Sequence, residues 1–570
     1  MGVTADTINY RLGLIIAALF LLALLPRLYS AQTLGWGWDH PDSFTLINFD
    51  EGGSCRAALD GFSYSTFIGR QTIGIASMIG LGPAQGISGD ERAVKAYCHS
   101  RAHILVARTY SAVLGSLTVL LVAWLGLQLM PGAPAVGWTA GGLLAVSGFH
   151  ISQSHSGTVD AASSFFIYLF IGLMVWSLRR KNNKGLVISP LFALFAVWTK
   201  YWVFAVFAYL ALIPLAWWKV MSDGFSGRRL LLLVLAVSLW LAALTNTSFP
   251  RAGLSPLLIV YALIVPWQRV NWTMRVVWIL LPLLLWALTQ VDLISAYTSS
   301  GAGGRFGSGY AAIGDNKWLR NIVNIPAVLL LGIGIPACIF MPMGVRSLLR
   351  GSRNSRLWVC LLPVLAFLLF MAFLAPVTYY RHYLPLIPAA CLLAAVGLHS
   401  TSWGRRPWFI ALFLAWPALL GWDMVSDYHR DPRLLMRPWY QQHAHATVFT
   451  SFYVSPPPGV RAALFRPEYA AGDGESLKQA DFLVLSENWY DTAFANELNG
   501  PRVGDLDKLV KTTPTYAAFY RQALSGEHPL LEPAEAFKLQ HFMPELLLHR
   551  QWYGNFQLFV GDLRVFRVVK

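Results

Sequence analysis

Acidic side chains are concentrated in one short stretch of the chain. Four of its 29 acidic residues lie in the sequence WDHPDSFTLINFDE, namely Asp39, Asp42, Asp50 and Glu51, with His40 among them. An apolar run that starts near Leu12 precedes the stretch and is long enough to span a bilayer. Carboxylates held at a membrane boundary are costly, so they are usually retained for function. We therefore interpret this stretch as the floor of a catalytic site at a membrane surface.

Three later segments bring further polar residues to the same predicted side of the membrane. They are Ser154 to Asp160, Thr199 to Tyr201, and Tyr379 to Tyr383. A carboxylate can deprotonate a hydroxyl, and Lys or Arg can stabilise a leaving phosphate. Together these residue types suit chemistry on an anionic lipid.

Each of these residues also has a structural interpretation. Asp50 and Glu51 could be a solvated helix start, and Asp160 could cap a helix. Lys200 could extend its amine from a helix end to the interface. His155 and His382 are more typical of structural hydrogen-bonding residues than of metal ligands.

Composition predicts a polytopic membrane protein. The chain has 570 residues, of which 55% are hydrophobic and 13% charged, whereas soluble domains carry roughly 25% charge. We predict about thirteen transmembrane helices, with eleven to fourteen allowed. They fall at about 12–31, 104–129, 135–150, 161–178, 186–199, 202–218, 230–246, 254–267, 276–292, 322–344, 357–375, 384–399 and 407–422.

Basic residues set the predicted orientation. They cluster in every second loop, as in Arg179-Arg180-Lys181 and Arg405-Arg406, and these loops are placed in the cytoplasm. The loops 32–103, 151–160, 247–253, 293–321 and 376–383 then lie outside, with everything after about 423. Arg101 and Arg108 are exceptions that the rule tolerates. The same pattern accounts for the net charge of +15, so we predict no nucleic-acid binding.

The chain divides into two predicted domains. Residues 1–422 form the membrane domain, which includes the outer loop 32–103, and residues 423–570 form a soluble extracytoplasmic α/β domain. The run from Asp481 to Leu485 predicts a buried strand, and 557–560 with 565–568 predict a hairpin. Cys55 and Cys98 share the outer loop, where they could form a disulfide or remain free thiols.

Known motifs exclude several chemistries. The sequence has no Walker A loop, no Gly-rich dinucleotide fingerprint, no HExxH and no GxSxG. A reaction driven by ATP or NAD therefore has no support.

The order of four features resembles the membrane glycosyltransferases of the GT-C class, in the branch of bacterial aminoarabinose transferases and protein O-mannosyltransferases. The features are an acidic pair in the first outer loop, a Ser-His-x(4)-Asp segment, an aromatic-Arg-x-Tyr-Leu-x(4)-Pro segment, and Asp-x-Arg with a later Trp. Here they are Asp50-Glu51; Ser154, His155 and Asp160; Tyr380, Arg381, Tyr383, Leu384 and Pro388; and Asp431, Arg433 and Trp439. The resemblance does not cover the C-terminal domain.

The resemblance implies inverting transfer of one sugar from a polyprenyl-phosphate donor, such as undecaprenyl phosphate, to a lipid, glycan or protein acceptor. Asp50 would be the general base, while Lys200, Arg381 and Tyr380 would bind the donor phosphate. Glu51, Asp42 or Asp160 would assist, and a divalent metal could be held by Glu51, Asp160 and His155. Other GT-C members have HPDE where this chain has His40-Pro41-Asp42-Ser43, so the main base is either Asp42 or Asp50.

Two other functions remain open at the level of sequence. A transporter or flippase for an anionic or lipid-linked substrate is one, although no internal repeat is found. An oligosaccharide transferase or glycan polymerase is the other. The resemblance places the enzyme in a bacterial inner membrane, with its site and C-terminal domain in the periplasm.

Overall fold

The fold is known from a computed structural model. It describes residues 5–33, 50–62, 64–180, 184–200, 317–350, 380–451, 459–465, 476–490, 514–538 and 562–570, with single positions between 364 and 371 and between 454 and 457. Predicted spans between 202 and 292, Asp42, and the proposed strand 557–560 lie outside the described residues.

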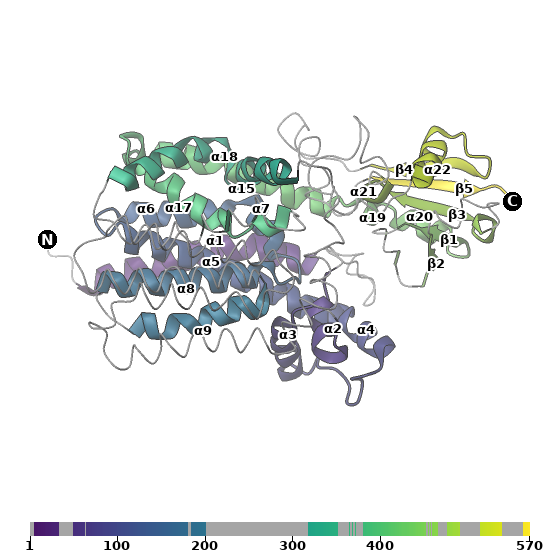
Figure 1. Ribbon diagram of the computed structural model, residues 1–570, viewed down its shortest axis with the longest axis horizontal. Helices are drawn as coiled ribbons and strands as arrows, with labels where there is room; N and C mark the ends of the chain where they lie inside the picture. The colour runs from purple at the N-terminus through teal and green to yellow at the C-terminus, as the bar shows by residue number, and fades with distance from the viewer. Residues whose placement is uncertain are drawn as a thin grey trace, which may run out of the picture.

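A bundle of apolar helices forms the larger part of the described structure (Figure 1). Its helices are α1 (Ala5–Thr33), α5 (Arg101–Leu129), α6 (Pro134–Val146), α7 (Gly148–Ser154), α8 (Asp160–Arg180), α9 (Lys184–Thr199), α15 (Lys317–Arg350), α17 (Leu386–His399) and α18 (Pro407–His429). Five segments of the described residues are long and apolar enough to cross a membrane: Leu12–Thr33, Arg101–Leu129, Asp160–Ser177, Ile325–Ser347 and Pro407–Gln442. The chain is therefore an α-helical membrane protein, and the predicted number of thirteen spans stays a prediction.

Glycines let these helices approach closely. A Cβ on Gly126 of α5 would meet the backbone of Gly137 in α6, and one on Gly148 of α7 would meet Gly421 in α18. Lipid provides no hydrophobic driving force for helix association. Small residues at such crossings let the backbones approach, and the resulting van der Waals packing stabilises the helix pair. On the outside of the bundle, α1 exposes Leu21, Leu22 and Leu25, as a lipid-facing helix does.

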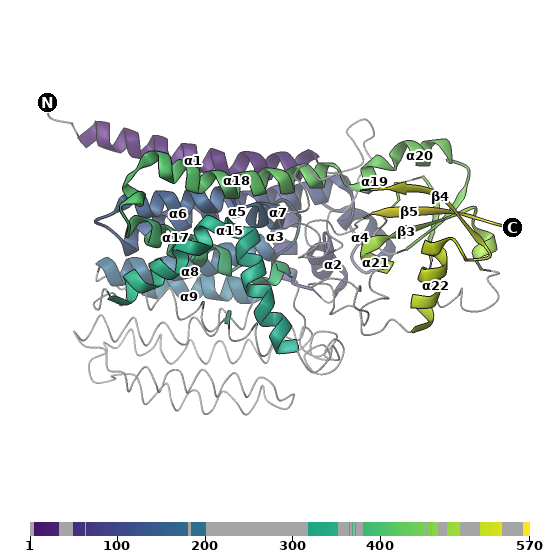
Figure 2. The same ribbon diagram turned by 90° about the horizontal axis from the view of Figure 1, so that it is seen from above.

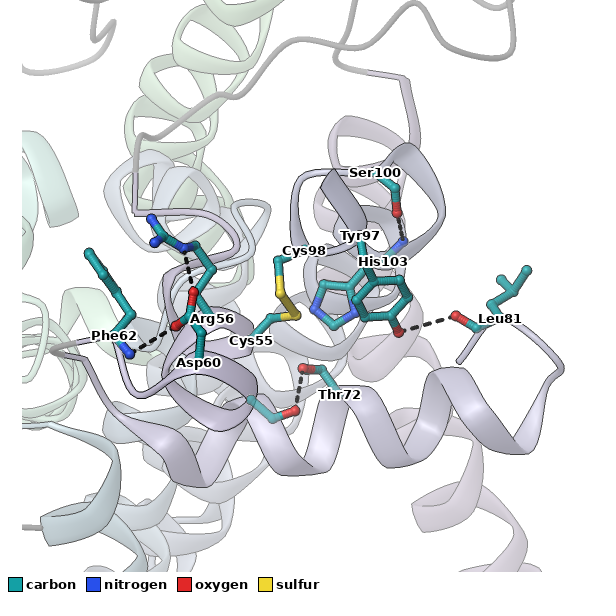
Figure 3. The surroundings of a disulfide bond; sticks show 11 residues. Cys55, Arg56, Asp60, Phe62, Thr72, Leu81, Tyr97, Cys98, Ser100 and His103 are labelled. Atoms are coloured by element: carbon teal, nitrogen blue, oxygen red, sulfur yellow. Dashed lines mark hydrogen bonds and ion pairs between the residues drawn. A yellow bond between two sulfur atoms is a disulfide. The ribbon is translucent and has the colours of Figure 1, made fainter. Parts of the chain in front are cut away.

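The less apolar segment that follows α1 forms three short helices at one end of the bundle. They are α2 (Gly53–Asp60), α3 (Thr66–Met78) and α4 (Glu91–Cys98). A disulfide joins Cys55 of α2 to Cys98 of α4, and both cysteines are buried. Figure 3 shows the bond between these two helices, with Tyr97 and His103 beside it. The disulfide that the spacing left open is therefore present.

The C-terminal part contains a five-stranded sheet in the order β2-β1-β3-β5-β4. The strands are β1 (Thr447–Thr450), β2 (Arg461–Leu464), β3 (Phe482–Ser486), β4 (Leu531–Phe537) and β5 (Leu563–Val568). β1 pairs parallel with β2 and β3, whereas β5 lies antiparallel between β3 and β4. The predicted strand at 481–485 is confirmed as β3.

Short helices accompany the sheet. They are α19 (Pro432–Leu435), α20 (Arg437–Gln442), α21 (Glu487–Tyr490) and α22 (Pro514–Ser525). The α22 face buries Phe519, Tyr520, Phe566 and Val568, and the opposite face buries Trp439, Val448 and Val565.

The sheet lies beyond the end of the bundle that carries α2–α4 (Figures 1 and 2). Helix α18 leads directly toward it and ends at His429, past the predicted domain boundary at 422. At that end the ring of His429 stacks on Tyr29 of α1, and its Nε2 lies 2.7 Å from Thr33 Oγ1. Helices α1 and α18 thus terminate together.

Candidate active site

Glu51 is locked into a buried ion pair. It lies in the turn that precedes α2, and its two carboxylate oxygens accept from Arg108 Nε at 2.7 Å and Arg108 Nη2 at 2.9 Å. The backbone N–H of Gly157 donates to Glu51 Oε1 at 2.7 Å. Neither side chain of the pair is exposed. Glu51 therefore joins the turn to α5 and to the segment before α8, and its side chain is buried.

A second ion pair joins α8 to the end of α9. Asp160, the first residue of α8, accepts from Lys200 Nζ at 2.9 Å and from Thr158 Oγ1 at 3.1 Å. Asp160 is 1% exposed and Lys200 is 13% exposed. A carboxylate in a first helical turn is stabilised by the helix dipole. The buried Asp160 carboxylate therefore holds the Lys200 ammonium, which is the more exposed of the two groups.

Asp50 is the accessible carboxylate of the three. Its Oδ2 accepts from Arg381 Nη2 at 2.5 Å, and its side chain is 34% exposed against 13% for Arg381. Arg381 lies in the 3₁₀ helix η4 (Tyr380–Tyr383), which precedes α17. Residues 331 positions apart are thereby brought into contact.

The Asp160–Lys200 and Asp50–Arg381 ion pairs form one charged cluster. Lys200 interacts electrostatically with Asp50 and Arg381 as well as with Asp160, and Asp160 interacts with Arg381 and His382. The sequence prediction that these residues share one end of the membrane domain agrees with this arrangement. The cluster contains two cations and one partly exposed carboxylate at the end of an apolar bundle.

Tyr168 holds the segment that carries Arg381. Its hydroxyl, two turns after Asp160 on α8, donates to Pro385 O at 2.6 Å and accepts from Ala389 N at 3.1 Å. Helix α17 begins at Leu386, so Ala389 N is among the first N–H groups of a helix, which have no carbonyl partner within it. One helix, α8, therefore positions Asp160 directly and Arg381 through its connection to α17.

Three other residues of the resemblance, His155, Asp431 and Trp439, contact protein side chains. His155 is fully buried, with its ring edge against Tyr428 of α18 at 4.6 Å between centroids. Asp431 accepts from Arg433 Nη2 at 2.6 Å and also from Arg433 N at 2.9 Å, which caps α19. Trp439 packs against Phe482 of the sheet.

A metal does not fit the predicted ligands in this arrangement. Among the described residues no three His, Cys, Asp or Glu side chains gather into a group that could hold one. Glu51 is already bound by Arg108, Asp160 by Lys200, and His155 contacts Tyr428. Of the remaining candidates, Asp42 lies outside the described residues, and Tyr380 is placed in η4 by its backbone.

Arg108 is the residue that sequence reasoning missed. The charge rule treats it as a tolerated exception, whereas the structure makes it the partner of Glu51. The signal was present, because a basic residue within the apolar run of α5 needs a compensating group. Arg27 of α1 is a parallel case: it donates to the carbonyls of Leu144 and Ala145 at the end of α6.

Comparison with known proteins gives weak likenesses. No known protein family matches the chain, and no curated protein does. Among solved structures, the Archaeoglobus fulgidus oligosaccharyltransferase AglB, in complex with an inhibitory peptide and a dolichol-phosphate, is similar at 13% identity and a TM-score of 0.44. The match covers 86% of this chain and 71% of that one. The oligosaccharyltransferase of the same organism in complex with Zn and sulfate matches at 12% identity and a TM-score of 0.42, over 84% and 69%. Likenesses of this size do not assign an activity to the present chain.

Proposed function

We propose that this protein is an inverting membrane glycosyltransferase that moves one sugar from a polyprenyl-phosphate donor to a lipid, glycan or protein acceptor. The observation that carries the proposal is the cluster of Asp50, Arg381, Lys200 and Asp160. It combines one accessible carboxylate with two partly exposed cations at the end of an apolar bundle. Such a cluster suits a donor whose phosphate lies at the membrane surface while its tail lies among apolar helices.

The proposed role of each residue follows from its exposure. Asp50 takes the proton of the acceptor hydroxyl, whose oxygen attacks the anomeric carbon of the sugar as the bond to the phosphate oxygen breaks. Lys200 and Arg381 stabilise the phosphate that leaves. In the present arrangement Arg381 holds Asp50, so binding of the donor phosphate by Arg381 would free Asp50 to act as the base.

Buried carboxylates serve as supports in this proposal. Asp160 keeps Lys200 in place, and Glu51 with Arg108 fixes the turn that presents Asp50. The Cys55–Cys98 disulfide supports placing this end of the bundle in an oxidising compartment, the bacterial periplasm.

The test is turnover by the purified protein with a panel of polyprenyl-phosphate monosaccharides, with release of polyprenyl phosphate as the readout. Asp50→Asn should lower the rate by about 10²–10⁴-fold, the usual contribution of a general base. Glu91→Gln is the matched control, because Glu91 lies in the same region with 79% of its side chain exposed. Its rate should equal that of the wild type.

Substitution of the cations tests donor recognition. Lys200→Gln and Arg381→Gln should lower kcat/KM, whereas Lys95→Gln, on the exposed side of α4, should not. Full activity of Asp50→Asn would overturn the mechanism. Failure of every donor in the panel, with transport of the same lipids in vesicles, would favour the flippase alternative. Chromatography of the product separates transfer of one sugar from transfer of an oligosaccharide.

A further inference from the structure

The sheet carries a hollow with features of a ligand site, away from the charged cluster of the bundle. A cavity of about 420 Å³ lies on the α22 face, between α21, α22, β4 and β5. Its lining includes Tyr490, Leu524, Pro533, Arg564 and Phe566. This volume falls in the range of small-molecule pockets, near its lower end.

Arg564 is the cationic residue of the cavity lining. It alternates along β5 with Val565, whose side chain packs on the opposite face, so it shares the α22 face with Phe566 and Val568. Its Nε is buried and has no hydrogen-bond partner among the described residues. A buried guanidinium N–H normally has an acceptor, and an anionic oxygen is the acceptor that it binds best.

The acidic residue of the described lining, Glu535, does not neutralise Arg564. Glu535 pairs in the sheet with Val565, whereas Ala536 pairs with Arg564. Directly paired residues of an antiparallel ladder point to the same face, so the side chain of Glu535 points away from that of Arg564, although Glu535 is part of the cavity lining. The positive charge of Arg564 is therefore available within the cavity.

The remaining lining favours a small ring-shaped ligand over a peptide. Tyr490 and Phe566 provide aromatic surface, and the volume suits one or two sugar rings. A peptide could add to the edge of β4, but Pro533 and the bulge between Pro533 and Glu535 interrupt that edge.

We propose that this cavity binds a sugar that carries a carboxylate or a phosphate, with Arg564 bound to the anionic group. The sugar would be part of the acceptor, and this assignment of its role rests on the proposed function. Binding itself needs no donor, so the two can fail separately.

The experiment is saturation-transfer NMR on the full-length protein in detergent, with four probes: glucuronate, glucose 6-phosphate, glucose and inorganic phosphate. Glucuronate or glucose 6-phosphate should bind about tenfold more tightly than glucose, as expected for a charge-assisted hydrogen bond. The better of the two acidic sugars identifies the anionic group. Tighter binding of inorganic phosphate than of both sugars would overturn the proposal, because it would show a simple anion site.

Three variants locate the binding. Arg564→Gln should weaken it about tenfold, and Leu524→Trp should block it by filling the cavity. Arg567→Gln is the control, because Arg567 is an exposed arginine of the same strand that does not line the cavity. Unchanged binding by both Arg564→Gln and Leu524→Trp would overturn the proposal, as would equal binding of glucose and the acidic sugars by the wild type.

Discussion

Exposure separates the carboxylates of the site into two kinds of residue. Asp50 is 34% exposed, whereas Glu51, its neighbour in sequence, is not exposed at all. Adjacent residues in a turn point in different directions, so one can face a substrate while the other anchors the backbone. In the proposed function, Asp50 is therefore the reactive group of the acidic pair and Glu51 the structural one.

Substitution of each residue should show this difference. Glu51→Gln leaves Arg108 with an uncompensated buried charge, which should lower the free energy of unfolding by about 3–5 kcal/mol. Asp50→Asn should change stability little while it lowers turnover by about 10²–10⁴-fold. The measurement is unfolding in SDS micelles beside the turnover assay, with Glu91→Gln as the control. Equal stability of Glu51→Gln and the wild type would show that the ion pair is not structural.

His99 makes the stability of the folded protein depend on pH. It follows α4, and its burial, reinforced by Lys95 and Arg56, lowers its pKa below the ordinary 6.5. The unfolded chain then binds a proton that the folded protein does not, so stability rises with pH across the window between the lowered pKa and 6.5.

The unfolding free energy should therefore be smaller at pH 5 than at pH 7.5, and His99→Gln should reduce that difference. His445→Gln is the control, because His445 is an exposed histidine near the sheet. An unchanged pH dependence in His99→Gln would show that other groups are responsible.

At the scale of elements, the turn that carries Asp50 and Glu51 is held from one side by the end of α4. Gly52 has a φ of +80°, and a Cβ at this position would overlap the ring of His99 and the carbonyl of Cys98. Gly61, at the other end of α2, has a φ of +75° and open space around it. The two glycines therefore share the backbone requirement but differ in packing.

Alanine substitutions can separate these two effects. Gly61→Ala should lower stability by about 1–2 kcal/mol, the penalty of a left-handed conformation. Gly52→Ala should lower it by more and should also reduce turnover, because the turn must move away from α4. Unfolding midpoints and turnover rates of the two variants test this difference. Equal effects of both substitutions would mean that the contact with His99 does not hold the turn.

The disulfide between α2 and α4 should also support the turn that carries Asp50 and Glu51. Joining Cys55 to Cys98 closes a loop of 43 residues that begins four residues after Glu51. Replacing both cysteines by Ala should cost about 2–4 kcal/mol and reduce turnover, whereas Cys338→Ala should do neither. Migration on non-reducing gels verifies the bond. Full activity of the double variant would show that the turn needs no such support.

The sequence indicates the charged residues of the cluster but not the ion pairs that they form. Asp50, Asp160, Lys200 and Arg381 are predicted as site residues because charged residues are rare in apolar surroundings, and the structure places them in one cluster. The pairing of Glu51 with Arg108 was not found, because hydropathy locates spans without specifying which ones pack together. Strand β4, with the sequence LEPAEAF, was missed because its Pro533 and two glutamates are untypical of a strand, and its exposed edge position allows them.

At the scale of the whole molecule, the sheet lies beyond the end of the bundle that carries α2–α4 (Figure 2). The charged cluster includes Asp50, which lies in the turn directly before α2. Helices α1 and α18 both end there, whereas η5 (Trp403–Arg405) precedes α18 at the opposite end. An acceptor bound by the sheet would therefore meet the donor without crossing the membrane. This arrangement requires that both parts lie in one compartment.

Reporter fusions in a bacterial inner membrane test that requirement. Alkaline phosphatase, which needs an oxidising compartment to form its disulfides, should be active when fused after Lys570. It should be inactive when fused after Arg405, because the basic residues before α18 predict that this loop lies in the cytoplasm. Formation of the Cys55–Cys98 bond in the intact protein is the independent control, since it reports on the compartment of α2–α4. An inactive fusion at Lys570 together with an intact disulfide would place the sheet and the charged cluster on opposite sides and would exclude a shared acceptor.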